Sequence, residues 1–105
     1  MLSQAKPVKL IIDQERTLVY DNRAEFRMGS LERPFTISDL RNKRRAWSAL
    51  VAWVWACLSE KDSLDFASPE ALSIVLRDEK IVAEAFAAFI ETYTAALPTS
   101  KKAEG

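Results

Sequence analysis

The sequence predicts a mainly α-helical α+β domain, in which an N-terminal β-hairpin is followed by about four helices packed as a small bundle. Two short runs of strand-forming residues come first, and apolar residues then recur at helical spacing as far as residue 97. The chain has 105 residues, 49% of them hydrophobic and 29% charged, which suits one hydrophobic core. We therefore expect a single domain over residues 1–97 and a disordered tail over residues 98–105.

The hairpin is expected between Val8 and Tyr20. Residues 8–12 and 17–20 are rich in β-branched and aromatic side chains, and the polar residues 13–16 between them suit a turn. The turn has no Asn-Gly or Asp-Gly pair, so the sequence leaves the strand register open. Because two strands alone are marginal in water, the hairpin must pack on helices or pair with another chain.

A short helix is expected over residues 23–29. Asp21 is a good N-cap residue, and Gly29 is well placed to end the helix. Pro34 disfavours helix at the residue before it, so residues 31–35 are expected to form a connecting loop.

The longest helix is expected to begin at Thr36 or Ser38 and to run to about Ser59. Trp53 and Trp55 fall on two side faces of this helix, which is apolar almost all round. Such a helix must be wrapped by the other elements or covered in part by a partner. Its main apolar face carries Trp47, Leu50, Val51, Val54 and Leu58.

Two further helices are expected in the C-terminal part. Ser68 as cap and Pro69 as the first helical residue predict a short helix over residues 69–76. Asp78 predicts the start of a longer amphipathic helix, which Pro98 ends. The apolar stripe of this last helix comprises Val82, Phe86, Phe89, Tyr93 and Leu97.

The composition argues against catalysis. The chain has no histidine, which removes the commonest general base and the commonest zinc ligand. The single cysteine, Cys57, lies in an apolar run and is expected to be a buried thiol in a reducing compartment. Two glycines cannot make a phosphate-binding loop. We expect no enzyme, no cofactor, no metal site and no small-molecule substrate.

Charge is distributed unevenly, although the formal net charge is zero. Residues 31–58 carry five basic and two acidic side chains, whereas residues 59–105 carry five basic and nine acidic ones. A basic run near the start of the longest helix consists of Arg41, Lys43, Arg44 and Arg45. Because cations oppose the dipole at a helix N-terminus, we expect an acidic surface to face this run, either within the fold or in a neighbouring subunit. Arg44 and Arg45 are therefore candidate subunit contacts.

The basic run leaves open a second function, that of a small DNA-binding or regulatory protein. Clustered Lys and Arg side chains neutralise phosphates. The zero net charge and the absence of a recognisable DNA-binding motif favour protein contacts over nucleic acid. No membrane association is expected, because the apolar run over residues 46–58 is thirteen residues long and a span needs about 20.

Three tryptophans occur within nine residues of the expected longest helix. Tryptophan is enriched at interaction hot spots. Trp47 lies on the main apolar face and is expected in the core. Trp53 and Trp55 point away from that face and from each other, so they are the candidate partner-binding residues, with a core position as the alternative for each.

The order of the elements is similar to that of a known family. The hairpin segment reads VKLIIDQERTLVYD and leads into NRA, and the tryptophan-rich helix segment reads LVAWVWACL and is followed by an acidic turn. Over residues 8–97 the chain resembles the tail assembly chaperones of long-tailed bacteriophages, related prophages and gene transfer agents. Relatives often have glycine in the hairpin turn, where this chain has Gln14.

The resemblance implies a role in tail morphogenesis. Such chaperones coat the long helical tape measure protein before the tail tube forms, and they are absent from the finished virion. The implied protein is non-catalytic, cytoplasmic in the host cell and homo-oligomeric, with the tape measure protein as its partner and the tail tube protein as a second partner. A structural tail component that stays in the virion is the remaining alternative.

Overall fold

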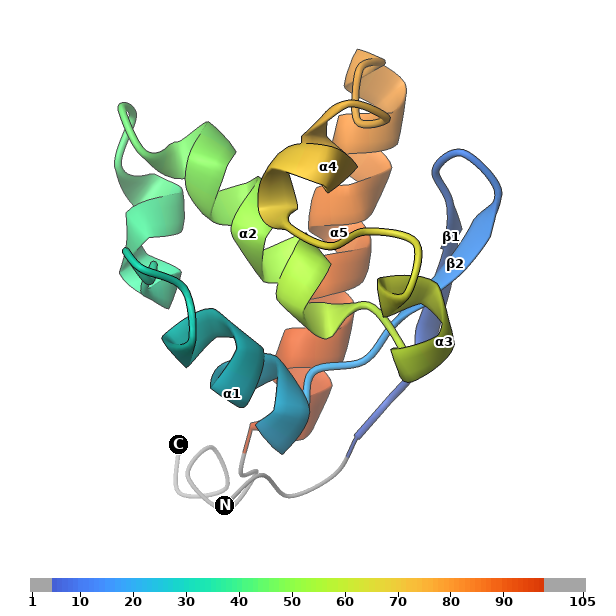
Figure 1. The fold of residues 1–105 in the computed structure, drawn as a ribbon, viewed down its shortest axis with the longest axis horizontal. Helices are drawn as coiled ribbons and strands as arrows, with labels where there is room; N and C mark the ends of the chain where they lie inside the picture. The colour runs from blue at the N-terminus through green and yellow to red at the C-terminus, as the bar shows by residue number, and fades with distance from the viewer. Residues whose placement is uncertain (1–4, 98–105) are drawn as a thin grey trace.

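The computed structural model describes residues 5–97 and has the expected mainly helical α+β architecture, with an N-terminal hairpin followed by helices (Figure 1). The expected disordered tail over residues 98–105 lies outside the described residues. The elements are β1 (Val8–Ile11), β2 (Glu15–Leu18), α1 (Asn22–Gly29), the 3-10 helix η1 (Ile37–Arg41), α2 (Ala46–Cys57), α3 (Glu60–Ser63), α4 (Pro69–Ser73) and α5 (Glu79–Ala96). Helix α2 is central and contacts α1, η1, α4 and α5, while the hairpin packs on α5.

The hairpin has a defined antiparallel register, in which Leu10 is opposite Arg16 and Ile11 is opposite Glu15. The second strand therefore begins two residues earlier than expected. The reason lies outside the hairpin, because the buried Arg16 side chain binds carboxylates of the α3 region and this fixes its place in β2. Long-range contacts of this kind override weak local turn preferences.

The second edge of the hairpin is paired within the chain. Leu18 forms an antiparallel bridge with Leu58, and the Val19 N–H donates to the Cys57 carbonyl at 2.7 Å. The segment between α2 and α3 thus acts as a short third strand beside β2. The hairpin also packs on α5, which is one of the two arrangements that the sequence left open.

The single long helix expected from residue 36 to residue 59 is wrong, because the chain leaves helical geometry at Asn42 (φ −89°, ψ 115°). The Asn42 side-chain oxygen accepts from the Arg44 N–H at 3.0 Å, and its carbonyl accepts from the Ala46 N–H at 2.7 Å. Asparagine competes in this way for backbone groups. The basic run therefore lies mostly in a turn before α2, which begins only at Ala46, and α5 is the longest helix of residues 5–97.

Most of α2 is wrapped by other elements of the same chain. Its residues 49–54, together with Ala56 and Cys57, are buried. An aromatic cluster closes the core between α2, α5 and the segment after the hairpin, with ring centroids 4.9–6.4 Å apart. The cluster comprises Tyr20, Trp53, Phe89 and Tyr93. The surplus apolar surface expected around this helix is therefore internal, except at its N-terminal end.

The apolar stripe expected on α5 is wrong at Phe86, which is 42% exposed, and right at Phe89, which is fully buried. Hydrophobic periodicity marks the large apolar side chains, but the neighbouring elements decide which side of the helix is covered. The buried side of α5 runs mainly through small residues. Its members are Ala85, Ala88, Phe89, Thr92 and Ala96.

Thr92 ties α5 to the chain on both sides of the hairpin. Its buried hydroxyl donates to the Lys6 carbonyl at 2.6 Å and accepts from the Tyr20 N–H at 3.0 Å. Thr92→Val keeps the shape but leaves the buried Tyr20 N–H unpaired, so we expect the free energy of unfolding to fall by about 2 kcal/mol in urea denaturation.

The matched control is Thr94→Val, because the exposed Thr94 hydroxyl donates to the Ile90 and Glu91 carbonyls of its own helix. We expect this variant to change the free energy of unfolding by less than about 0.5 kcal/mol. Equal losses in the two variants would contradict a specific role for Thr92.

Candidate interaction surface

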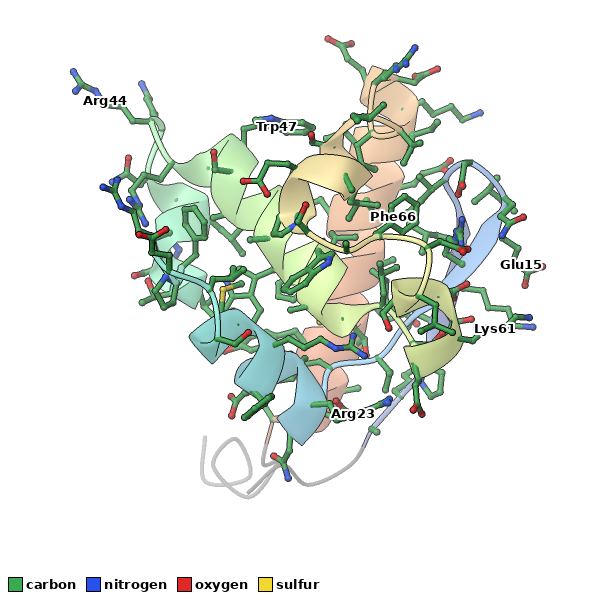
Figure 2. The ribbon with its side chains drawn as sticks, viewed as in Figure 1. Glu15, Arg23, Arg44, Trp47, Lys61 and Phe66 are labelled. Atoms are coloured by element: carbon green, nitrogen blue, oxygen red, sulfur yellow. The ribbon has the colours of Figure 1, made fainter. Side chains whose placement is uncertain are left out.

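An open groove with a volume of 540 Å³ lies on the face formed by α2, α4 and the loop between α1 and η1. The first half of α2 contributes Trp47, Ser48, Val51 and Ala52, while α4 and the loop lie along the other sides. Figure 2 shows Trp47 beside α4, at the N-terminal end of α2. The volume is within the range of about 300–1,000 Å³ that is common for binding sites. We refer to this feature as the Trp47 groove.

Trp47 is 46% exposed, so its expected core position is wrong. Because α2 begins at Ala46, Trp47 lies in the first helical turn, and no preceding turn of α2 can cover it. A large aromatic side chain that remains exposed beside a groove is the kind of residue that anchors binding partners. The late start of α2 therefore explains why Trp47 is exposed at the groove and why the prediction of a core position was wrong.

Trp53 is only 5% exposed, so the idea that it points to an interface is wrong. Its ring packs against Tyr20 and Phe89, and its indole N–H donates to the Thr36 carbonyl at 3.3 Å. Burial in the aromatic cluster makes Trp53 unavailable to a partner. Of the two positions left open for this residue, the core is the one found.

Trp55 is partly buried, and its indole N–H donates to the Phe66 carbonyl at 3.0 Å. It is not among the residues that line the Trp47 groove. Partner contact through its remaining exposed surface stays a prediction. The structure thus does not bring the two candidate tryptophans together at one site.

The members of the basic run differ in how they are held by the rest of the chain. Arg45 is held by its own chain, since its guanidinium lies 4.6 Å from the centre of the Phe35 ring and 3.3 Å from Asp39. Phe35 in turn lines the groove, as does Arg33. Arg44 is exposed and extends into solvent (Figure 2).

No carboxylate of residues 5–97 forms an ion pair with the other three members of the basic run, Arg41, Lys43 and Arg44. The acidic C-terminal half of the chain, as far as it is described, does not neutralise them. For these three residues, the acidic surface expected within the fold is therefore not found among the described residues. A surface on another molecule stays a prediction.

A signal for the exposed tryptophan was present in the sequence. Asn42 is followed by three cations and by no acidic residue, which is a poor composition for the first turns of a helix. A helix start shifted to Ala46 puts Trp47 in the first turn. The long apolar periodicity concealed this boundary, because it continues smoothly from Trp47 into the buried part of α2.

A polar cluster, separate from the Trp47 groove, links the hairpin to the α3 region. Arg16 is 3% exposed and reaches Asp13 and Asp65 at 2.6 Å each and Asp62 at 3.2 Å. Its guanidinium also lies 4.8 Å from the centre of the Phe66 ring. We call Arg16 and these three aspartates the Arg16 clasp.

The carboxylate of Asp62 is itself well satisfied. It accepts from the Thr17 N–H at 2.8 Å and from the Ser59 hydroxyl at 2.9 Å. Burial opposes its ionisation, but these hydrogen bonds and Arg16 together lower the pKa of Asp62. Since the groups of the clasp bind one another, we interpret it as a structural link between elements distant in sequence.

Two other kinds of site are a reactive cysteine and a metal centre. Cys57 is buried, and burial raises the pKa of its thiol, which disfavours the nucleophilic thiolate. Within residues 5–97, no group of three or more His, Cys, Asp or Glu side chains is placed to hold a metal ion. None of the helices in this part of the chain has both the length and the apolar character needed to cross a membrane.

No protein-family model, curated protein or solved structure matches this chain. The candidate site is therefore interpreted from its own geometry. It combines an exposed tryptophan, an open groove and a basic side on which Arg41, Lys43 and Arg44 have no carboxylate partner among residues 5–97.

Proposed function

We propose that this chain is a non-catalytic tail assembly chaperone that holds apolar segments of the tape measure protein in the Trp47 groove. The observation that carries the binding role is the exposed Trp47 side chain at the groove, while the other two tryptophans make hydrogen bonds inside the chain. Exposed aromatic anchors beside a hollow are typical of protein-binding hot spots. The resemblance to tail assembly chaperones supplies the identity of the client.

The size of the groove suits a chaperone that must later leave its client. Parts of two helices and one loop line the groove. This lining is smaller than a standard protein–protein interface, which buries about 1,600 Å² in total. Each copy is then expected to bind with modest affinity. A long client that carries many apolar segments would bind many copies, and any association between those copies would strengthen the whole complex. We place this activity in the host cytoplasm, with the chain as a homo-oligomer and the tail tube protein as a second partner.

Trp47→Ala tests this proposal in co-expression with the tape measure protein of the same genome. We expect the wild-type chain to keep the client in the soluble fraction, in a complex that contains many copies of this chain. Loss of a hot-spot tryptophan removes at least about 2 kcal/mol, so the variant should bind about 30-fold more weakly. Size-exclusion chromatography with light scattering measures the complex and its stoichiometry.

Leu64→Ala is the matched control, because Leu64 is 83% exposed and is not among the residues that line the groove. This variant should retain the client, and both variants should keep the melting temperature of the wild type within a few degrees. If the client aggregates beside the wild-type chain and the chain elutes alone, the proposal is wrong.

The two alternative functions give different results. A structural tail component would persist in purified particles, where mass spectrometry detects it, whereas a chaperone would be absent. A DNA-binding protein would bind duplex DNA with an affinity that falls steeply as the salt concentration rises. Arg41, Lys43 and Arg44 would be the phosphate contacts in that case.

A further inference from the structure

The floor of the Trp47 groove has the geometry of a helix-docking surface. Two pairs of α2 residues line it, Trp47 with Val51 and Ser48 with Ala52. Each pair is spaced by four residues, so the two rows run side by side along the helix. Val51 and Ala52 are buried beneath the groove, so α2 offers a partner the exposed Ser48 and Trp47 side chains. Ser48 is short, which allows a partner backbone to come close, while the Trp47 ring provides a large apolar contact.

The partner is expected to be a helix for a second reason. Helices and a loop form the sides of the groove, and β1 and β2 do not line it. An extended peptide that adds to a sheet would find no strand to pair with there. An amphipathic helix needs only an apolar surface for its stripe, and it satisfies its own backbone hydrogen bonds.

The charges around the groove determine which charged residues are favoured on the flanks of such a helix. Arg33 lines the groove, and the exposed Arg44 lies three residues before Trp47. The first turn of α2 has no acidic residue, and no side chain caps it. The positive end of the α2 dipole therefore adds to the potential of the nearby cations.

Two acidic residues also line the groove, and they give it a polarity. Glu70 belongs to α4, while Glu32 is next to Arg33 in the loop. Uncompensated positive charge thus lies toward the N-terminal end of α2, and negative charge is present on α4. A bound helix with acidic residues toward α2 and neutral or basic residues toward α4 matches both sides.

We propose that the Trp47 groove selects an amphipathic helix with an acidic flank, whose apolar stripe contacts Trp47 and whose carboxylates face Arg33 and the basic run. This inference rests on the proposed function, because the client supplies the helix. It adds a rule for which client segments bind. Duplex DNA would engage the cations but would leave the apolar part of the groove unfilled.

Two synthetic helices of about 20 residues test this rule. They share one leucine stripe and differ in one flank, which carries glutamates in the first and lysines in the second. Fluorescence anisotropy of labelled peptides measures both affinities at about 0.05 M and about 0.5 M salt. We expect the glutamate helix to bind at least tenfold more tightly at low salt, and we expect this preference to shrink at high salt.

Variants of the chain test whether binding and the preference for glutamate depend on the groove. Trp47→Ala should weaken both helices about tenfold or more, since it removes the shared apolar contact. The double variant Arg33→Glu with Arg44→Glu should abolish or reverse the preference for glutamate. Lys61→Glu makes one such reversal of charge, half of the change in the double variant, at an exposed position of α3 and should leave the preference unchanged.

Three results would overturn the inference. The first is equal binding of the two helices by the wild-type chain at low salt. The second is a loss of preference in Lys61→Glu as large as that in the double variant. The third is tighter binding of duplex DNA than of the glutamate helix, abolished by the double variant, which would assign the cations to nucleic acid.

The failure of this inference can be told apart from the failure of the proposed function. If Trp47 is needed to keep the tape measure protein soluble but the two helices bind equally, the chaperone proposal stands and the acidic-flank rule fails. If the glutamate helix is selected but the tape measure protein aggregates, the groove assignment stands and the client assignment fails.

Discussion

Replacing Arg16 by methionine is expected to lower the free energy of unfolding by about 3 kcal/mol, because it leaves the buried Asp62 without its cation. Methionine keeps an unbranched side chain beside Phe66 but removes the ion pairs to Asp13 and Asp65 as well. Urea denaturation followed by circular dichroism measures the loss. The expected value is at the lower end for a buried ion pair, since two of the three aspartates are accessible to solvent.

Arg23→Met is the control for this prediction. Arg23 pairs with Asp21 and Glu60 at an exposed position, and such pairs contribute between 0 and about 1 kcal/mol. Its removal should change the free energy of unfolding by about 0.5 kcal/mol or less. A similar loss for the two substitutions would show that the Arg16 clasp has no special role.

The effect of Arg16→Met should also depend on pH. The hydrogen bond from Arg16 lowers the pKa of Asp13, and the pKa of Asp62 is lowered despite its burial. A carboxylate whose pKa is lower in the folded state stabilises the protein above its unfolded pKa of about 4, and this stability is lost as the pH falls through the folded value. The difference between wild type and variant should therefore be full at pH 7 and narrow below about pH 4. A constant difference would contradict an ionic origin.

Phe89→Ala is expected to lower the free energy of unfolding by about 4 kcal/mol. The Phe89 ring is fully buried and lies 5.6–6.4 Å from the rings of Tyr20, Trp53 and Tyr93. A domain of this size should then melt about 20 °C lower. If the alanine variant does not fold, Phe89→Leu, which leaves a smaller cavity, should still show a loss of about 1–2 kcal/mol.

Phe86→Ala is the matched control on the same helix, three residues earlier. Because Phe86 is 42% exposed, its truncation should change the free energy of unfolding by less than about 1 kcal/mol. Hydrophobic periodicity placed both residues on one stripe, so the two variants also test the orientation of α5. Equal losses would mean that α5 is rotated from the orientation described here.

The sequence by itself determined where several elements begin, since capping depends on neighbouring residues. Asp21 caps α1, Ser68 caps α4 ahead of Pro69, and Asp78 caps α5, each by accepting backbone N–H bonds as expected. The existence of the hairpin and the buried state of Cys57 also followed from local composition. These features need only hydrogen bonds and apolar runs within a few residues.

Only the tertiary structure decided which large side chains are buried. Trp47 and Trp53 occur on one helix, as do Phe86 and Phe89, and in each pair one residue is in the core while the other is exposed. Periodicity defines the faces of a helix, but the neighbouring elements decide which face is covered. Arg16 meets Asp62 and Asp65 across 46 and 49 residues of chain, and no local pattern indicates such a contact. Packing between distant segments therefore placed both the Arg16 clasp and the Trp47 groove.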